Sequence, residues 1–247
     1  MTRLAALAIA LLAPAALLVR AEERQEFHQT YPLAATGHLS IHNVNGVVRV
    51  TAWDRNEVKV DAVKRARTRQ DLEEARIVVD ARADVVDIRT KYPEFGNRDG
   101  ATVDYTVMAP RQAVLQEISS VNGKVEIEGA AGTVKASAVN GEVQTRGLAG
   151  DADLSTVNGR VDAEFEKLAA RRIKMHSVNG PLTLTLPAGA GVRIAAHTVN
   201  GGLSSDFDLP VRKIGFGPGR DVETTIGDGS TDIRIDTVNG AINLKRR

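Results

Sequence analysis

Short segments in which apolar and polar residues alternate recur along most of this 247-residue chain. One series includes residues 124–128, 142–146 and 160–164, and a second includes residues 133–137 and 151–155. Successive side chains of a β-strand point to opposite faces, so each segment is predicted to be a strand with one buried and one solvated face. Because the two series alternate, each repeat would contain two strands.

The tripeptide Val-Asn-Gly occurs seven times, between the two strands of a repeat. From the second copy onward, the asparagines are 18, 18, 21, 21 and 39 residues apart. A nearly fixed period is typical of solenoids. Glycine adopts positive φ angles freely and asparagine tolerates them, so we expect Val in the core and Asn-Gly at the corners. The predicted turn residues are Asn45, Gly46, Asn122, Gly123, Asn140, Gly141, Asn158, Gly159, Asn179, Gly180, Asn200, Gly201, Asn239 and Gly240.

The repeat predicts an all-β fold, a parallel β-helix or β-solenoid with two short strands in each coil of 18–21 residues. Asn-Gly pairs also suit two-residue hairpins, so antiparallel meanders stay open as an alternative. In a parallel stack the asparagines from Asn122 to Asn200 would form a column, about 4.8 Å per step, along which side-chain amides can bond. Glycines at positions 129, 132, 147 and 150 are expected to form a second turn.

A single β-solenoid domain is expected over residues 22–247. Its first coil would lie at 38–53, followed by a non-repeating β-rich insertion at 54–110 and by regular coils at 111–247. The insertion is expected to contain strands near 58–63, 77–83, 85–90 and 102–108, and one short helix near 68–76 with a threonine cap.

The insertion breaks the repeat, and we therefore expect it to carry family-specific function. Residues 91–100 would form its exposed loop, either a binding loop or an ordinary turn. A second irregularity is the 39-residue interval after Asn200, close to two coils, in which residues 215–219 would form a looser corner. Gly227-Asp228-Gly229 is interpreted as a turn, because the nonapeptide repeats of calcium-binding β-helices are absent from the sequence.

The N-terminus predicts export. A short cationic start precedes an apolar run at 4–19, and small residues precede a cleavage site after Ala21, so residues 1–21 are interpreted as a signal peptide. The run is shorter than the roughly 20 residues of a membrane-spanning helix, and we expect no transmembrane anchor after cleavage; a retained helix is the alternative. The chain has no cysteine, which excludes disulfides and a lipoprotein anchor. The predicted location is periplasmic, cell-surface or extracellular.

Charge and composition limit the classes of possible partner and indicate the make-up of the core. Without residues 1–21, which contain Arg3 and Arg20, the chain has 30 basic and 31 acidic residues, and this balance argues against nucleic acid as a partner. Aromatic residues make up 4% of the chain, so its core is expected to consist of small aliphatic layers.

Candidate chemistry is sparse. His176 and His197 occupy the same position in consecutive copies of the repeat, two residues before its valine. One coil apart on the outer face, they would be weak candidates for a metal or pH-responsive site, with solvated side chains as the alternative. Glu126, Glu128, Asp162 and Glu164 share one predicted face, where a close pair of acids could cleave glycosides, although neighbouring cations favour charge pairing instead. We predict no catalytic residue and no cofactor.

The order of the motifs resembles a known family. The match comprises residues 107–110 with their closing proline, residues 120–206, residues 227–244 and the start near Ile41. Secreted bacterial proteins of a domain family of unknown function, catalogued as putative adhesins, show Val-(Ser/Asn)-Gly turns at similar spacing. The resemblance implies a β-solenoid of surface or periplasmic proteins, in some cases linked to envelope-stress signalling, and brings no catalytic residues.

Three functional classes follow. The first is an exported, noncatalytic binding or scaffold protein, adhesin-like, whose partner is a protein or polysaccharide of the envelope or cell surface. The second is a carbohydrate-active β-helix enzyme, which would need a cleft with converging acids. The third is a metal- or pH-responsive envelope sensor that uses His176 and His197.

Overall fold

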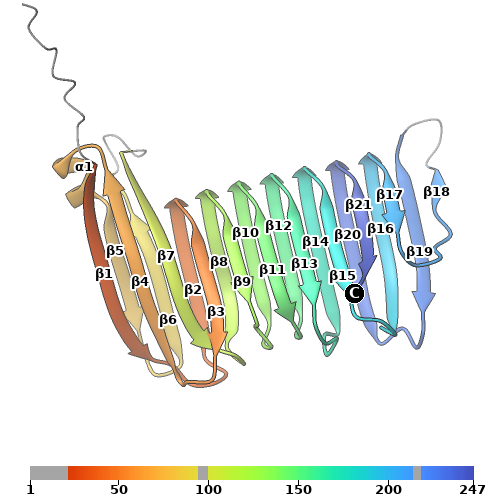
Figure 1. Ribbon diagram of the computed structural model, residues 1–247, viewed down its shortest axis with the longest axis horizontal. Helices are drawn as coiled ribbons and strands as arrows, with labels where there is room; N and C mark the ends of the chain where they lie inside the picture. The colour runs from red at the N-terminus through yellow and green to blue at the C-terminus, as the bar shows by residue number, and fades with distance from the viewer. Residues whose placement is uncertain (1–21, 94–99, 214–217) are drawn as a thin grey trace, which may run out of the picture.

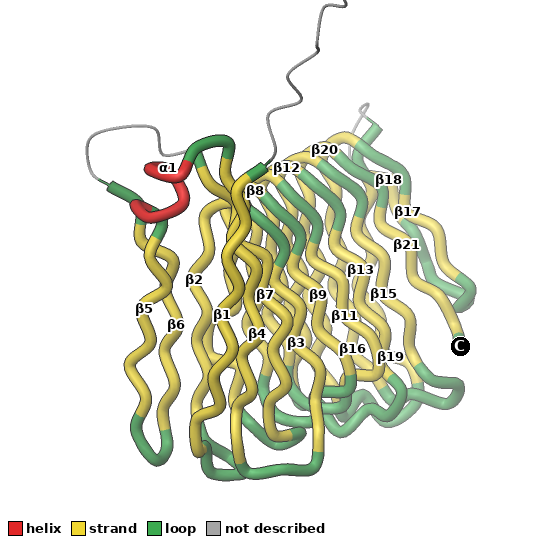
Figure 2. The backbone as a smooth tube through the Cα atoms, turned by 60° about the vertical axis from the view of Figure 1, so that its left-hand side comes forward, coloured by secondary structure: helices red, strands yellow, loops and turns green. Residues whose placement is uncertain are grey.

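The computed structural model describes residues 22–93, 100–213 and 218–247. These residues form two β-sheets that lie face to face along a long stack (Figures 1 and 2). In the described residues, the one α-helix is α1 (Arg69–Glu74). The all-β class predicted from the sequence is therefore confirmed. The predicted signal peptide, most of the 91–100 loop and most of the 215–219 corner lie outside the described residues.

Sheet A has ten strands and sheet B has eleven. In spatial order, sheet A contains β1 (Glu23–Pro32), β4 (Glu57–Ala66), β7 (Ala101–Pro110), β3 (Val48–Trp53), β9 (Val125–Glu128), β11 (Val143–Leu148), β13 (Val161–Phe165), β15 (Leu182–Leu186), β21 (Ile242–Arg246) and β17 (Leu203–Ser205). Sheet B contains β18 (Arg212–Lys213), β19 (Arg220–Ile226), β16 (Val192–Asn200), β20 (Thr231–Asn239), β14 (Arg172–Asn179), β12 (Ala152–Asn158), β10 (Val134–Asn140), β8 (Val114–Asn122), β2 (His38–Asn45), β6 (Val85–Lys91) and β5 (Arg76–Ala81).

The strands of the repeats pair in parallel, in both sheets. Among the described strands, antiparallel pairing is limited to the two ends of the stack, where β1 pairs with β4, β4 with β7, β5 with β6, and β19 with β16 and β18. The meander alternative therefore applies to the ends and not to the repeats.

The core lies between the sheets and follows from the alternation in the sequence. In β12, Ala152, Leu154 and Thr156 are buried while Asp153 faces solvent. Equivalent residues stack on one another from strand to strand, so that Leu154 lies in register with Met175 of β14. The layers form one continuous apolar cluster along the stack, which buries the inward face of every repeat.

The last repeat is not last in space. Strands β20 and β21 lie between β14 and β15 on one side and β16 and β17 on the other (Figure 1). The prediction that consecutive repeats stack in chain order is wrong at this point. After β15 the chain skips one strand position in each sheet and forms β16 to β19 beyond it. It then returns, and β20 and β21 occupy the skipped positions. Both edges of β20 thereby gain a parallel partner, and Ile233 and Ile235 join the core layers.

Residues 54–110 extend both sheets beyond β2 and β3. They supply β4 and β7 to sheet A, and β5 and β6 to sheet B, close to the segments predicted as strands. Helix α1 begins where predicted: the Thr68 hydroxyl accepts a hydrogen bond from the Asp71 amide. The C-terminal end of this helix is held by Lys64, whose ammonium donates to the Leu72 and Ala75 carbonyls. Strand β1 has no repeat pattern and was not predicted from the sequence.

Candidate functional surface

The valines of the repeated tripeptide face solvent, contrary to the prediction that they lie in the core. Val121, Val139, Val157, Val199 and Val238 retain 38%, 40%, 40%, 47% and 38% of their surface. Each second-series strand continues through its valine, so the alternation that buries Leu154 and Thr156 turns Val157 outward. Together with the partly exposed Val44 and Val178, these side chains form a file along sheet B, here called the valine row.

The inward position belongs to the residue before each valine. In five of the seven copies this residue is Ser or Thr, and it is buried. The Thr156 hydroxyl donates to the Gly141 carbonyl at 2.9 Å, and the Thr198 hydroxyl donates to the Gly240 carbonyl at the same distance. Ser120, Ser177 and Thr237 make equivalent bonds to the glycine of the neighbouring repeat. The recurring Ser or Thr before the valine is the sequence signal that marks the inward position.

The asparagines form a ladder along the corner. In six of the seven asparagines, the side-chain NH₂ group donates to the amide oxygen of the asparagine in the neighbouring strand, at 2.9–3.0 Å. All six bonds point in the same direction along the stack. The order is Asn45, Asn122, Asn140, Asn158, Asn179, Asn239 and Asn200, so the inserted strand β20 completes the ladder.

The glycines are required mainly for close packing. A Cβ atom on Gly159 would overlap the carbonyl oxygen of Gly141, and one on Gly180 would overlap that of Gly159. The same holds for Gly123, Gly141, Gly201 and Gly240 against the glycine of the adjacent repeat. Positive φ angles occur at both turns: 119° at Gly46 and 152° at Gly180 in the tripeptides, and 73° at Gly129 and 63° at Gly147 at the second turn. No described residue other than glycine has a positive φ angle, so the asparagines of the tripeptide do not use the left-handed region that they tolerate.

The two candidate histidines are not on adjacent strands. Asp236 of β20 lies between His176 and His197 in the register, and Asp221 of β19 lies beyond His197. His197 Nδ1 is 3.8 Å from Asp221 Oδ1, and Asp236 accepts a hydrogen bond from Arg234 at 2.8 Å. Within the described residues there is no cluster of three or more His, Cys, Asp or Glu that could hold a metal ion. The predicted one-coil separation is wrong because the last repeat is inserted there.

The acidic residues on sheet A lie among cations. Glu126 contacts Arg49 at 2.5 Å and Lys124 at 2.7 Å, and Glu142 contacts Arg160 at 3.0 Å. Burial acts to raise the pKa of Glu126, but the hydrogen bonds from Lys124 and Arg49 outweigh it and leave this pKa below its usual value. A shallow hollow of about 350 Å³ contains Asp162 and Glu164, together with Arg146, Arg160 and Lys245. On the outer face of sheet A, acidic side chains therefore lie next to basic ones.

Comparisons with known proteins relate this architecture to a family and to solved structures. The model of the Toastrack DUF4097 family matches residues 112–245, which is more than half of the chain. A putative cell adhesion protein from Clostridium sporogenes is similar in structure, with a TM-score of 0.53 and 13% identity over 92% of this chain and 100% of that one. A putative adhesin from Bacteroides fragilis, with a TM-score of 0.34 and 13% identity, aligns over 90% of this chain and 97% of its own.

No curated protein matches the sequence. The one helix in the described part of the chain has six residues, too few to cross a membrane. The family model and the shared fold confirm the resemblance inferred from the order of the motifs. The chain belongs to the Toastrack DUF4097 family.

Proposed function

We propose that this protein is an exported, noncatalytic β-solenoid that acts as an adhesin-like binding or scaffold protein of the cell envelope or surface. The valine row is the observation that carries this proposal. Five of its side chains keep 38–47% of their surface exposed, although the same strands bury every inward apolar residue. Contiguous exposed apolar surface on a soluble protein is typical of interaction sites.

The geometry of the row favours a long partner. Seven valines on adjacent strands, about 4.8 Å apart, extend over roughly 29 Å. The asparagine ladder fixes the spacing, because each amide is held by its neighbours. A rigid apolar row that needs little ordering on binding suits an extended segment of an envelope protein. A polysaccharide is the alternative partner.

The noncatalytic part of the proposal is supported by the chemistry of sheet A. A glycosidase needs one carboxyl with a raised pKa as its general acid. Glu126 has a lowered pKa and two cationic partners. Asp162 and Glu164 share their hollow with three basic residues. No observation on the described residues favours the enzyme or the metal sensor over binding.

Capture from the native envelope tests the proposal. A tagged protein of residues 22–247 would be compared with a Val139→Lys/Val157→Lys variant, whose exposed positions tolerate lysine. A Gln144→Lys/Asp162→Lys variant, altered on sheet A, serves as the matched control. We expect the wild type and the control to recover the same envelope protein and the valine-row variant to lose it. Equal recovery by all three would contradict the role of the row, and turnover of a polysaccharide panel would contradict the noncatalytic proposal.

A further inference from the structure

The two sheets end in four edge strands of very different length. Strand β1 has ten residues, whereas β5, β17 and β18 have six, three and two. Within the described residues, β1 has one neighbour, β4, and pairs with it in continuous register from Glu23 to Pro32. Short strands, bulges, internal prolines and charged side chains normally block edge pairing, and of these β1 has only charged side chains before its last residue. Its free edge thus offers unpaired backbone groups to another strand.

Helix α1 contacts β1 near its N-terminal end, and the position of β1 leaves the rest of this edge accessible (Figure 1). Sheet A continues for three strands beyond β3, namely β7, β4 and β1, while sheet B continues for two beyond β2. Strand β1 therefore lies one strand farther out than the edge of sheet B. On its inward side, Phe27 and Tyr31 are only partly buried against the end of the core, and Gln25 and Gln29 are exposed. An additional strand would extend this core and cover the two aromatic rings.

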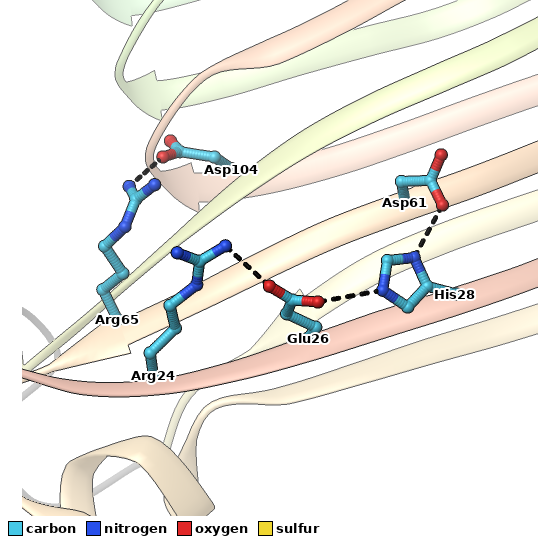
Figure 3. A network of polar contacts seen from close by, with 6 residues as sticks. All are labelled: Arg24, Glu26, His28, Asp61, Arg65 and Asp104. Atoms are coloured by element: carbon cyan, nitrogen blue, oxygen red, sulfur yellow. Dashed lines mark hydrogen bonds and ion pairs between the residues drawn. The ribbon is translucent and has the colours of Figure 1, made fainter.

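The outward side of β1 carries charges of alternating sign (Figure 3). Arg24 donates to Glu26 at 2.6 Å, and the His28 ring contacts Glu26 at 3.2 Å and Asp61 of β4 at 2.7 Å. Asp61 is also held by Lys59 at 2.8 Å. The hydrogen bond to Asp61, followed by that to Glu26, raises the pKa of His28. All these side chains are at least partly exposed, so they can also reach a neighbouring strand.

We propose that β1 pairs antiparallel with β1 of a second copy of this chain, with Phe27 opposite the partner's Phe27. In this two-fold arrangement, residues at equal distance on either side of Phe27 face one another. Glu26 then lies opposite the partner's His28, and the same contact is repeated on the other side of the axis. Both copies use the same surface, as expected for an isologous dimer.

Other symmetric registers fit less well. Centring the pair on Glu26 sets two carboxylates against each other and Arg24 against the partner's His28. Centring it on Gln25 sets Arg24 against the partner's Glu26, but it also sets the charged Glu23 against the partner's Phe27 and separates the two Phe27 rings; the proposed register sets Glu23 against the partner's Tyr31 near the strand ends and keeps the Phe27 rings together. Like charges directly opposite one another destabilise a strand pair. The register centred on Phe27 alone joins opposite charges outside and aromatic rings inside.

Cysteine cross-linking tests the register, because the chain has no cysteine of its own. In the proposed dimer Gln25 lies opposite the partner's Gln29, within disulfide range, whereas two copies of Gln25 are about 13 Å apart. We expect a mixture of Gln25→Cys and Gln29→Cys proteins to form a disulfide-linked dimer on mild oxidation, and either variant alone to stay unlinked. A Val78→Cys variant on the β5 edge is the control and should stay unlinked in every mixture.

The mass in solution gives an independent result. At pH 6, below the ordinary histidine pKa of about 6.5, light scattering should show a dimer of the mature chain, and Glu26→Lys should raise its dissociation constant on the order of tenfold, because the two contacts of Glu26 with protonated His28 become repulsive. A chain that remains monomeric at high concentration would overturn the proposal. Linkage by each cysteine variant alone as efficiently as by the mixture would overturn the register. A monomer that instead binds a foreign strand at β1 would show that the partner is not a second copy.

Discussion

The regular repeats and the N-terminal extension are parts of the same two sheets, yet they are held together differently. In the repeats the same contacts recur along the stack: the asparagine ladder and the glycine contact at each step, and the Ser or Thr hydroxyl bond at every step except that from β8 to β10, where Ala138 takes its place. In the extension, contacts occur once. Where it joins the first repeat, Thr90 of β6 donates to Asn43 of β2 at 2.9 Å and bonds Tyr105 of β7 at 2.7 Å.

This junction is buried and polar. Asn43 also donates to the Val103 carbonyl at 2.8 Å, and Tyr105 is completely buried. Burial raises the pKa of the Tyr105 phenol, so that it stays protonated and available for the Thr90 bond. The repeats therefore distribute their stability over many equivalent contacts, whereas the extension depends on a few specific ones. Loss of one contact should have different consequences in the two regions.

The largest effect is expected at a glycine of the repeat. Gly159→Val would force side-chain atoms against the Gly141 carbonyl, which also accepts the Thr156 hydroxyl bond. We expect a loss of about 3 kcal/mol or more in the free energy of unfolding, measured by urea denaturation. Asp162→Val on the outer face of sheet A should change it by no more than about 0.5 kcal/mol. Equal losses would show that the glycine contact is not required.

A core residue and a residue of the valine row should differ in the stability that is lost on truncation to alanine. Leu154 is fully buried and Val157 is 40% exposed, although they are three residues apart in one strand. Leu154→Ala should cost about 2–5 kcal/mol, whereas Val157→Ala should cost less than about 1 kcal/mol. Denaturation of both variants under one set of conditions is sufficient. A larger loss from Val157→Ala would place the valine back in the core.

A smaller effect compares the two kinds of polar contact. Tyr105→Phe removes one buried hydrogen bond at the junction, while Asn158→Ala removes two bonds of the exposed ladder. Each should cost about 1 kcal/mol. Hydrogen exchange should distinguish them, because protection in the Tyr105→Phe variant should fall across β6 and β7, and in Asn158→Ala only near β10 and β14. Uniform loss of protection in both variants would contradict the contrast between the regions.

The smallest effect concerns the exposed network of β1. The pKa of His28 is raised, so its contribution to stability is complete below pH about 6.5 and is lost as the pH rises through the folded value. The pKa values of Glu26 and Asp61 are lowered, mainly by His28 and by Lys59 respectively, so their contribution is lost as the pH falls below about 4. NMR titration of His28 should show a pKa closer to 6.5 in an Asp61→Asn variant. An unchanged pKa would show that the contact is absent in solution.

Sequence periodicity predicts the strands that repeat, but not the order in which they pair or the elements that occur once. Alternation and a fixed spacing identify the strands around Leu154, and the Thr68 cap marks α1, because these signals are local. The outward direction of Val157 was missed because the strand was ended before the tripeptide. The place of β20 could not be predicted, since strand pairing is nonlocal and a 39-residue interval does not say which neighbours the returning strand will choose. Strand β1 has no counterpart in the repeat at all.

The insertion of the last repeat between β14 and β16 completes the ladder, the core and the valine row. Pairs of cysteines introduced into the outer face of sheet B test it directly. Strands in contact place paired Cα atoms about 4.8 Å apart, within disulfide range, and strands separated by another lie about 9.6 Å apart, beyond it. His176→Cys/Asp236→Cys and Asp236→Cys/His197→Cys should each form an intramolecular disulfide, and His176→Cys/His197→Cys should not. A disulfide in the last variant and none in the first two would mean that the repeats stack in chain order.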